Sequence, residues 1–200
     1  MDNTEYLKQI SQTVRPEKKS RGWMSSPIFK VVVGGILAFI VIMIIGSVIT
    51  GGKTSLKEQT ISLKLHVENT MNVVSEYQTN LKSSDLRSSS ASLSGILSNT
   101  NRKLTEYIEG KYSDKDSKDL EEEATTHKDE LENDLFEAKI NGILDRIFAH
   151  KMALEVSLII AEETSIYDAS KDENLKSILE SSYNSLNNLY NNFNDFSETK

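Results

Sequence analysis

Residues 140–161 read INGILDRIFAHKMALEVSLIIA, and this stretch indicates the fold. Its apolar residues recur at spacings of three and four, which is the period of an α-helix. They also occupy more than one face, and a helix that is apolar nearly all round must be surrounded by other helices. A membrane span is not predicted here, because ionisable side chains interrupt the stretch: Asp145, Arg146, His150, Lys151 and Glu155. We therefore expect a central helix that at least two others cover.

The longest apolar stripe of this helix includes Ile147, Leu154 and Leu158. We expect Leu154 to be fully buried, so that Leu154→Ala costs about 2–5 kcal/mol of unfolding free energy. His150 lies between Ile147 and Leu154 in the sequence. This position predicts a hydrogen-bonded histidine in the core or at its boundary, rather than a metal ligand.

The preceding segment, residues 118–139, has a narrow apolar stripe and a broad acidic face. We expect it at the periphery of a bundle or in a thin coiled-coil extension. Asn141 and Gly142 could end this helix, but the apolar period continues past them. One long helix over 118–167 and a kink at Gly142 are both compatible with the pattern.

Three further helical segments are predicted around these two. The first begins at Ser55, which forms a capping-box pattern with Glu58, and the second follows a break at 83–85. The last begins after a second capping-box pattern, Ser170 with Glu173. Residues 111–117 have loop composition, and the Ser-rich and Asn-rich stretches at 88–92 and 184–194 are expected to face solvent.

The predicted fold of residues 53–200 is therefore all-α, a helical bundle of four to five helices. Either a compact bundle or an elongated, coiled-coil-like hairpin fits the pattern. The composition agrees: the 200-residue chain has two prolines, none of them after Pro27, and nine glycines. Such a long proline-free stretch argues against a turn-rich β protein. The absence of cysteine excludes disulfides, thiolate metal sites and thiol nucleophiles.

Ahead of the bundle, residues 31–50 read VVVGGILAFIVIMIIGSVIT and carry no charge. As a helix this window spans about 30 Å, the thickness of the hydrocarbon core of a bilayer. It is too long for the apolar part of a signal peptide, and no A-x-A-like cleavage site follows it. We expect an uncleaved transmembrane helix over 28–50, after a basic and disordered cytoplasmic tail over 1–27.

The charge pattern predicts the orientation of this span. Residues 1–30 carry a net charge of +3, and residues 51–200 carry −10. Lys and Arg residues close to the span set topology: five lie in residues 15–30 and three in residues 51–65. The N-terminus is therefore expected in the cytoplasm and residues 53–200 outside it, in a single-pass arrangement. Gly34 and Ala38 form a small-xxx-small pair that could pack two spans together.

Few residue patterns point to chemistry. Glu123, His127, Glu130 and Asp134 share one helix face, and this stripe could hold a divalent cation if a second helix added ligands. We expect a solvated acidic face instead, with no catalytic residues, no cofactor and no metal. The sequence has neither a P-loop nor a G-x-S-x-G motif. Nucleic-acid binding is not expected, because the large domain is acidic.

These observations predict a non-enzymatic, membrane-anchored interaction or scaffold module on the outer face of a bacterial cytoplasmic membrane. Its expected partners are membrane lipids and either another protein or further copies of this chain. Two alternatives remain open. The bundle could sense or bind a small molecule in a cavity near residues 144–160, or it could be a subunit of a larger envelope assembly.

Overall fold

The computed structural model describes residues 55–112 and 118–196, and these residues form an all-α fold. The predicted helical bundle is confirmed, and no strand occurs within these two ranges. The helices are α3 (Leu56–Tyr77), the short 3-10 helix η2 (Gln78–Asn80), α4 (Ser84–Lys111), α5 (Lys118–Ile140), α6 (Leu144–Ala169) and α7 (Glu173–Asn194).

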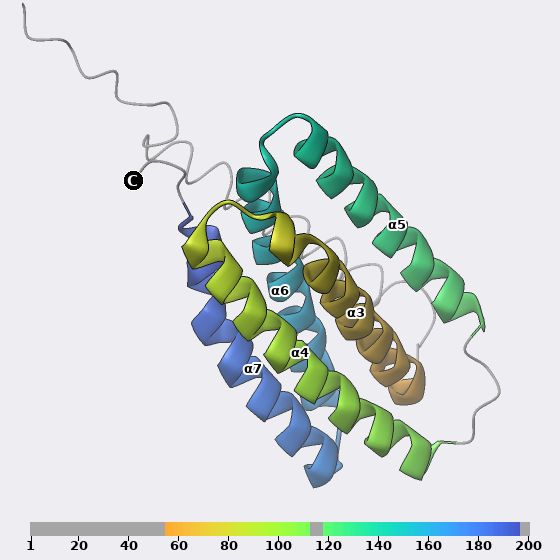
Figure 1. Ribbon diagram of the computed structural model, residues 1–200. Coiled ribbons are helices and arrows are strands. Elements are labelled where there is room, and N and C mark those ends of the chain that lie inside the picture. Colours follow the sequence, from red (N-terminus) through yellow and green to blue (C-terminus); the bar gives the residue numbers. More distant parts are fainter. Residues whose placement is uncertain (1–54, 113–117, 197–200) are drawn as a thin grey trace, which may run out of the picture. The chain divides into compact units, whose positions relative to one another are not determined.

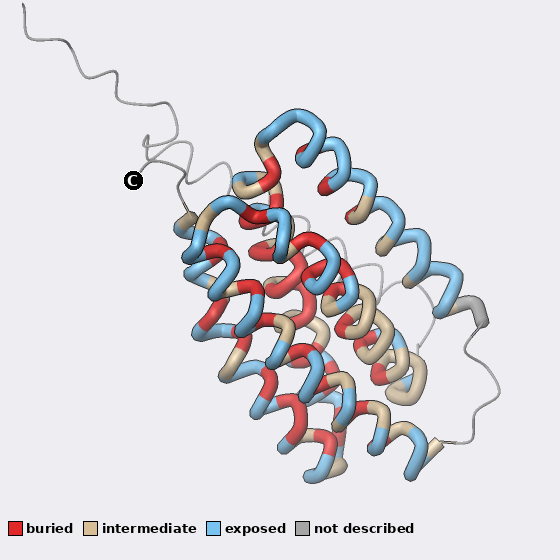
Figure 2. The backbone as a smooth tube through the Cα atoms, viewed as in Figure 1, coloured by how far each residue is buried: buried red, intermediate tan, exposed pale blue. Residues whose placement is uncertain are grey.

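Four of the helices form a closed ring around one core. Helix α3 packs against α4, α4 against α7, α7 against α6, and α6 against α3. Figure 1 shows that each neighbouring pair in this ring runs antiparallel. Helix α5 lies outside the ring and packs on both α3 and α6. The buried positions line the inner faces of the ring, and the outer face of α5 is exposed along its length (Figure 2).

The N-terminal ends of the first two helices follow the predicted capping chemistry. The Ser55 hydroxyl accepts from the Glu58 backbone N–H, and the Glu58 carboxylate accepts from the Ser55 N–H, so the capping box is confirmed. Ser83 caps α4 by accepting from the Leu86 N–H. Asp145 of α6 also accepts from Ser83 N, at 2.7 Å, and thereby ties the α3–α4 connection to the central helix.

The predicted cap of the last helix was wrong by two residues. Asp172, not Ser170, caps α7, because its carboxylate accepts from the N–H groups of Asn174 and Leu175. The Ser170 hydroxyl instead accepts from the Asp172 N–H. Ser170 therefore holds the connecting turn, and Asp172 begins the helix.

The pattern over 118–167 resolves into two helices that separate at Gly142. This glycine has a φ of +73°, the left-handed conformation that an L side chain disfavours. Gly142 N–H donates to Lys139 O and Ile143 N–H donates to Ala138 O, the two bonds of a Schellman motif. The chain therefore reverses at Gly142, and α6 returns beside α5.

Gly142→Ala should destabilise the bundle by about 1–2 kcal/mol, since alanine is strained in the left-handed region. No atom lies within 4 Å of the added methyl group, so the backbone conformation alone sets this cost. Gly95→Ala is the matched control, because Gly95 lies in α4 with equally open space around it. That change should stabilise by about 0.5–1 kcal/mol. Thermal melts of both variants provide the measurement. If the two melting temperatures shifted in the same direction, the left-handed conformation of Gly142 would be contradicted.

Helix α6 is the central helix, as predicted, but its buried stripe lies one residue later than expected. Leu154 and Ile147 are half-buried, whereas Phe148 and Ile159 have no exposed surface. One residue corresponds to about 100° around a helix. The prediction that Leu154 is fully buried was therefore wrong, and the shifted stripe places Glu155 in the core with 2% of its surface exposed.

Helix α5 lies at the periphery, as predicted. Its buried positions are Leu131, Leu135 and Ala138, and the rest of the helix is largely exposed. Near its C-terminal end, Phe136 and Ile140 are 53% and 64% exposed. The asparagines of α7 are exposed as expected, but Ser90 was wrongly assigned to solvent. Ser90 is fully buried in α4 and donates to Leu86 O.

The predicted tail over 1–27, the predicted span over 28–50 and the Gly34–Ala38 pair lie outside the described residues. Among the helices that are described, none combines the length and the apolar character needed to cross a membrane.

Candidate functional site

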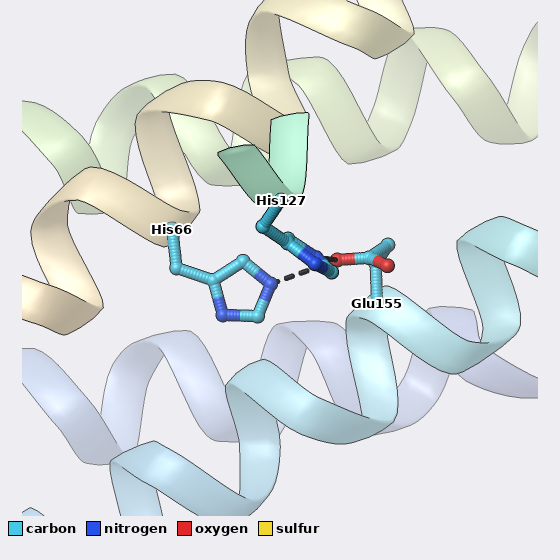
Figure 3. A group of neighbouring side chains, drawn as sticks. All are labelled: His66, His127 and Glu155. Carbon is cyan, nitrogen blue, oxygen red and sulfur yellow. Dashed lines mark hydrogen bonds and ion pairs between the residues drawn. The ribbon is translucent and has the colours of Figure 1, made fainter. Parts of the chain in front are cut away.

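Two histidines and a glutamate converge where α3, α5 and α6 meet (Figure 3). His66 Nε2 lies 2.8 Å from Glu155 Oε2, and His127 Nε2 lies 3.0 Å from the same oxygen. The rings of the two histidines are perpendicular, with centroids 5.5 Å apart. One ligand atom from each residue lies within 4.8 Å of the others. We call these three residues the His66–His127–Glu155 cluster.

Each helix presents its member of the cluster for a local reason. His66 precedes Val67 on α3 and follows Leu63 by one turn, so it borders the buried stripe of that helix. His127 lies one turn before Leu131, where the narrow buried stripe of α5 begins. Glu155 lies on the buried stripe of α6 between Phe148 and Ile159. The cluster is therefore built into the packing of α5 on the four-helix ring.

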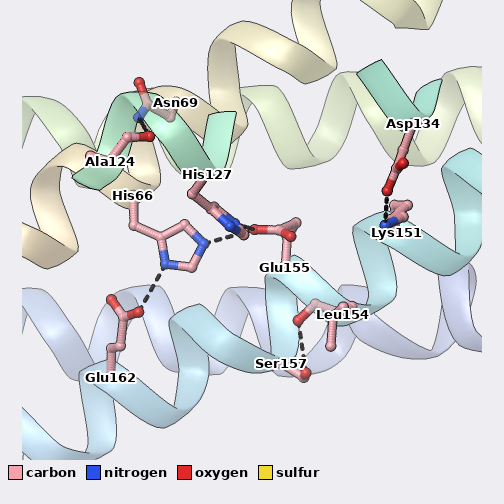
Figure 4. A network of polar contacts seen from close by, with 10 residues as sticks. All are labelled: His66, Asn69, Ala124, His127, Asp134, Lys151, Leu154, Glu155, Ser157 and Glu162. Carbon is pink, nitrogen blue, oxygen red and sulfur yellow. Dashed lines mark hydrogen bonds and ion pairs between the residues drawn. The ribbon is translucent and has the colours of Figure 1, made fainter. Parts of the chain in front are cut away.

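A second layer of contacts holds the cluster in place (Figure 4). His66 Nδ1 lies 2.9 Å from Glu162 Oε1, two turns along α6 from Glu155. Asn69 donates to the Ala124 carbonyl at 2.8 Å and thereby fastens α5 to α3 beside the cluster. Both nitrogens of His66 are consequently committed, Nε2 to Glu155 and Nδ1 to Glu162.

The charges of the cluster depend strongly on one another. Burial alone would lower the pKa of His66, but the carboxylates of Glu162 and Glu155 raise it to about 10. Burial alone would raise the pKa of Glu155, but hydrogen bonds from His127 and His66 lower it to about 2. The hydrogen bond to Glu155 raises the pKa of His127 as well. These pKa values favour a protonated His66 and an ionised Glu155 at neutral pH.

The acidic stripe predicted on α5 does not come together as one site. Glu123 and Glu130 are exposed. Asp134 forms an ion pair with Lys151 of α6. His127 is the member of that stripe that reaches other potential ligands, and these come from α3 and α6 rather than from α5.

Two expectations about single histidines also changed. His150, predicted in the core or at its boundary, is exposed, because the buried stripe of α6 lies one residue away from the predicted one. His66 had no predicted role, yet its side chain is only 10% exposed and central to the cluster. The residues of the cluster lie 61 and 28 positions apart, so no local motif could reveal them. A usable signal is present, because Glu155 interrupts the most apolar of the described helices.

The cluster can act chemically in two ways. It can serve as a metal-free ion-pair network that fastens α5 to the ring, or it can offer two imidazole nitrogens and a carboxylate oxygen to a cation. The side chain of His127 is 45% exposed, so one side of the cluster is open to solvent. No protein-family model, curated protein or solved structure matches the chain, and the interpretation therefore depends on the geometry alone.

Proposed function

We propose that this chain is a single-pass membrane protein whose helical bundle acts as a non-enzymatic interaction or scaffold module. In this proposal the segment 28–50 anchors the chain in a bacterial cytoplasmic membrane, with its N-terminus inside and residues 53–200 outside. The observation that carries the proposal is the uncharged 20-residue window over 31–50 directly before a folded bundle that begins at Leu56.

The surface of the bundle supports an interaction role. Phe136 and Ile140 are exposed one turn apart on α5, and the rest of that helix is dominated by exposed polar and acidic residues. In protein–protein interfaces an apolar centre is surrounded by a polar rim, and in this proposal Phe136 and Ile140 form part of that centre. Lipids contact the span itself in this proposal, and the acidic bundle is not suited to nucleic acid.

Protease accessibility tests the topology. Trypsin added to intact spheroplasts should cleave at Lys111 or Lys118, which flank the connection between α4 and α5. An epitope at the N-terminus should stay intact until the membrane is permeabilised, since it would lie in the cytoplasm. Permeabilised spheroplasts provide the control in which both ends are digested. Protection of the bundle in intact spheroplasts, with digestion only after permeabilisation, would contradict the proposal.

A ligand-binding role is the second candidate, and a hollow at one end of the bundle favours it. This open cavity of about 1180 Å³ includes Leu144 and Asp145 at the start of α6, with polar residues of the α3–α4 turn and of α7 around it. Membership of a larger envelope assembly is the third. Purification in mild detergent separates it from the scaffold role, because an assembly retains its other subunits in fixed proportion.

A further inference from the structure

We propose that the His66–His127–Glu155 cluster binds a divalent transition-metal ion, and that zinc fits it best. Two imidazole nitrogens and one carboxylate oxygen converge from three helices. Glu155 Oε2 lies 2.8 Å from His66 Nε2 and 3.0 Å from His127 Nε2. Zinc bonds to such ligands are about 2.0–2.2 Å long, which places tetrahedral ligand atoms about 3.4 Å apart. To admit the ion, each nitrogen would move about half an ångström away from the shared oxygen, and the two nitrogens, which lie within 4.8 Å of each other, would move closer together.

The ligand types select the class of ion. Imidazole nitrogen suits zinc and its first-row neighbours, whereas calcium and magnesium prefer oxygen ligands throughout. Three protein ligands leave a fourth tetrahedral position. The side chain of His127 is 45% exposed, so the cluster is open to a water molecule or to a group of a partner that could take that position.

Glu162 supplies the support that a metal-binding histidine needs. Its carboxylate contacts His66 Nδ1 at 2.9 Å, so a proton on Nδ1 leaves Nε2 free to face the site. A carboxylate that fixes the tautomer and orientation of a ligating histidine is a recurrent feature of zinc sites. The two glutamates contact different nitrogens of His66. Glu162 contacts Nδ1 and would orient the ring, whereas Glu155 contacts Nε2 and would itself be a metal ligand.

The proposal is independent of the membrane anchor, and the full-length chain in detergent tests it. After treatment with chelator, Zn²⁺ is titrated by calorimetry and the melting temperature is recorded with and without the ion. We expect one Zn²⁺ per chain and a higher melting temperature, because a ligand that binds the folded state stabilises it. No saturable binding, with an unchanged melting temperature, would leave a metal-free ion-pair network and overturn the proposal.

Matched histidine variants locate the site. His127→Gln should weaken Zn²⁺ binding at least tenfold, while His150→Gln, the same change at an exposed position of α6, should leave it unchanged. Glu162→Gln should weaken binding about 10–100-fold through the orientation of His66. His127 is half-exposed, so its variant should keep the helical circular dichroism of the parent. Equal affinity in His127→Gln and the parent, or equal losses in the two histidine variants, would overturn the assignment.

Discussion

Ile159→Ala is expected to reduce the free energy of unfolding by about 2–5 kcal/mol, because it removes a fully buried side chain and leaves a cavity. Ile159 lies on the central helix, which packs against α7, α3 and α5. Against a typical total of about 5–15 kcal/mol, this loss is large. A measured loss of this size would identify α6 as the centre of the core.

The next residue provides the control. Ile160→Ala is the same chemical change one position along the same helix, but Ile160 is only partly buried at the edge of the core. Its loss should be less than half that of Ile159, since less apolar area leaves the core. Urea melts of both variants in a fragment of residues 53–200, which contains every described helix, make the comparison. Equal losses would show that the buried stripe of α6 is misplaced.

This pair also shows what the sequence could and could not predict. The caps at Ser55 and Ser83 were predictable, because capping depends on residues three positions apart or fewer. The central position of α6 was predictable from its apolar content. The phase of its stripe was not, since a helix that is apolar on several faces does not indicate which face lies deepest. The pattern therefore places Leu154 in the core, whereas in the structure the neighbouring Glu155 lies there.

The candidate site was beyond prediction for a related reason. The sequence makes His127 a candidate ligand on its own helix only if a second helix adds further ligands. His66 and Glu155 meet that condition, but only the packing of α5 against α3 and α6 brings the three together. The sequence gives no register for that packing, because the apolar stripe of α5 is narrow. The contacts among these three polar residues therefore become visible only in the folded structure.

A second buried carboxyl group on α6 gives the other large expected effect. Glu163 is 1% exposed, and the Ser182 hydroxyl lies near its carboxylate without forming a hydrogen bond of good geometry with it. Burial raises the pKa of Glu163 to about 8; the Ser182 hydroxyl opposes this rise, and the charge of Glu162 adds to it. The group is therefore expected to be mainly protonated in the folded protein at neutral pH.

The sign of the pH effect follows from proton binding. The ordinary pKa of this group is 4.5, so between pH 4.5 and about 8 the folded chain holds a proton that the unfolded chain has lost. Stability from this group is fully present below pH 4.5 and falls as the pH rises toward 8. Each unit of pKa difference corresponds to about 1.4 kcal/mol. We expect Glu163 to account for a loss of about 2–4 kcal/mol between pH 5 and pH 8.

Glu163→Gln should abolish that loss, because glutamine resembles the protonated acid in shape and cannot ionise. The variant should match the parent near pH 5 and exceed its stability by about 2–4 kcal/mol at pH 8. His66 also loses stabilising charge as the pH rises through 6.5 to 10, so the difference between variant and parent, rather than the parent alone, isolates Glu163. Glu180→Gln, an exposed change on α7 in a shallow pocket that Glu163 also lines, should leave the pH dependence intact. Urea melts at pH 5, 6.5 and 8 provide the measurement. If the free energy of unfolding changed with pH in the same way in the parent and in Glu163→Gln, Glu163 would ionise in the folded protein as it does in water.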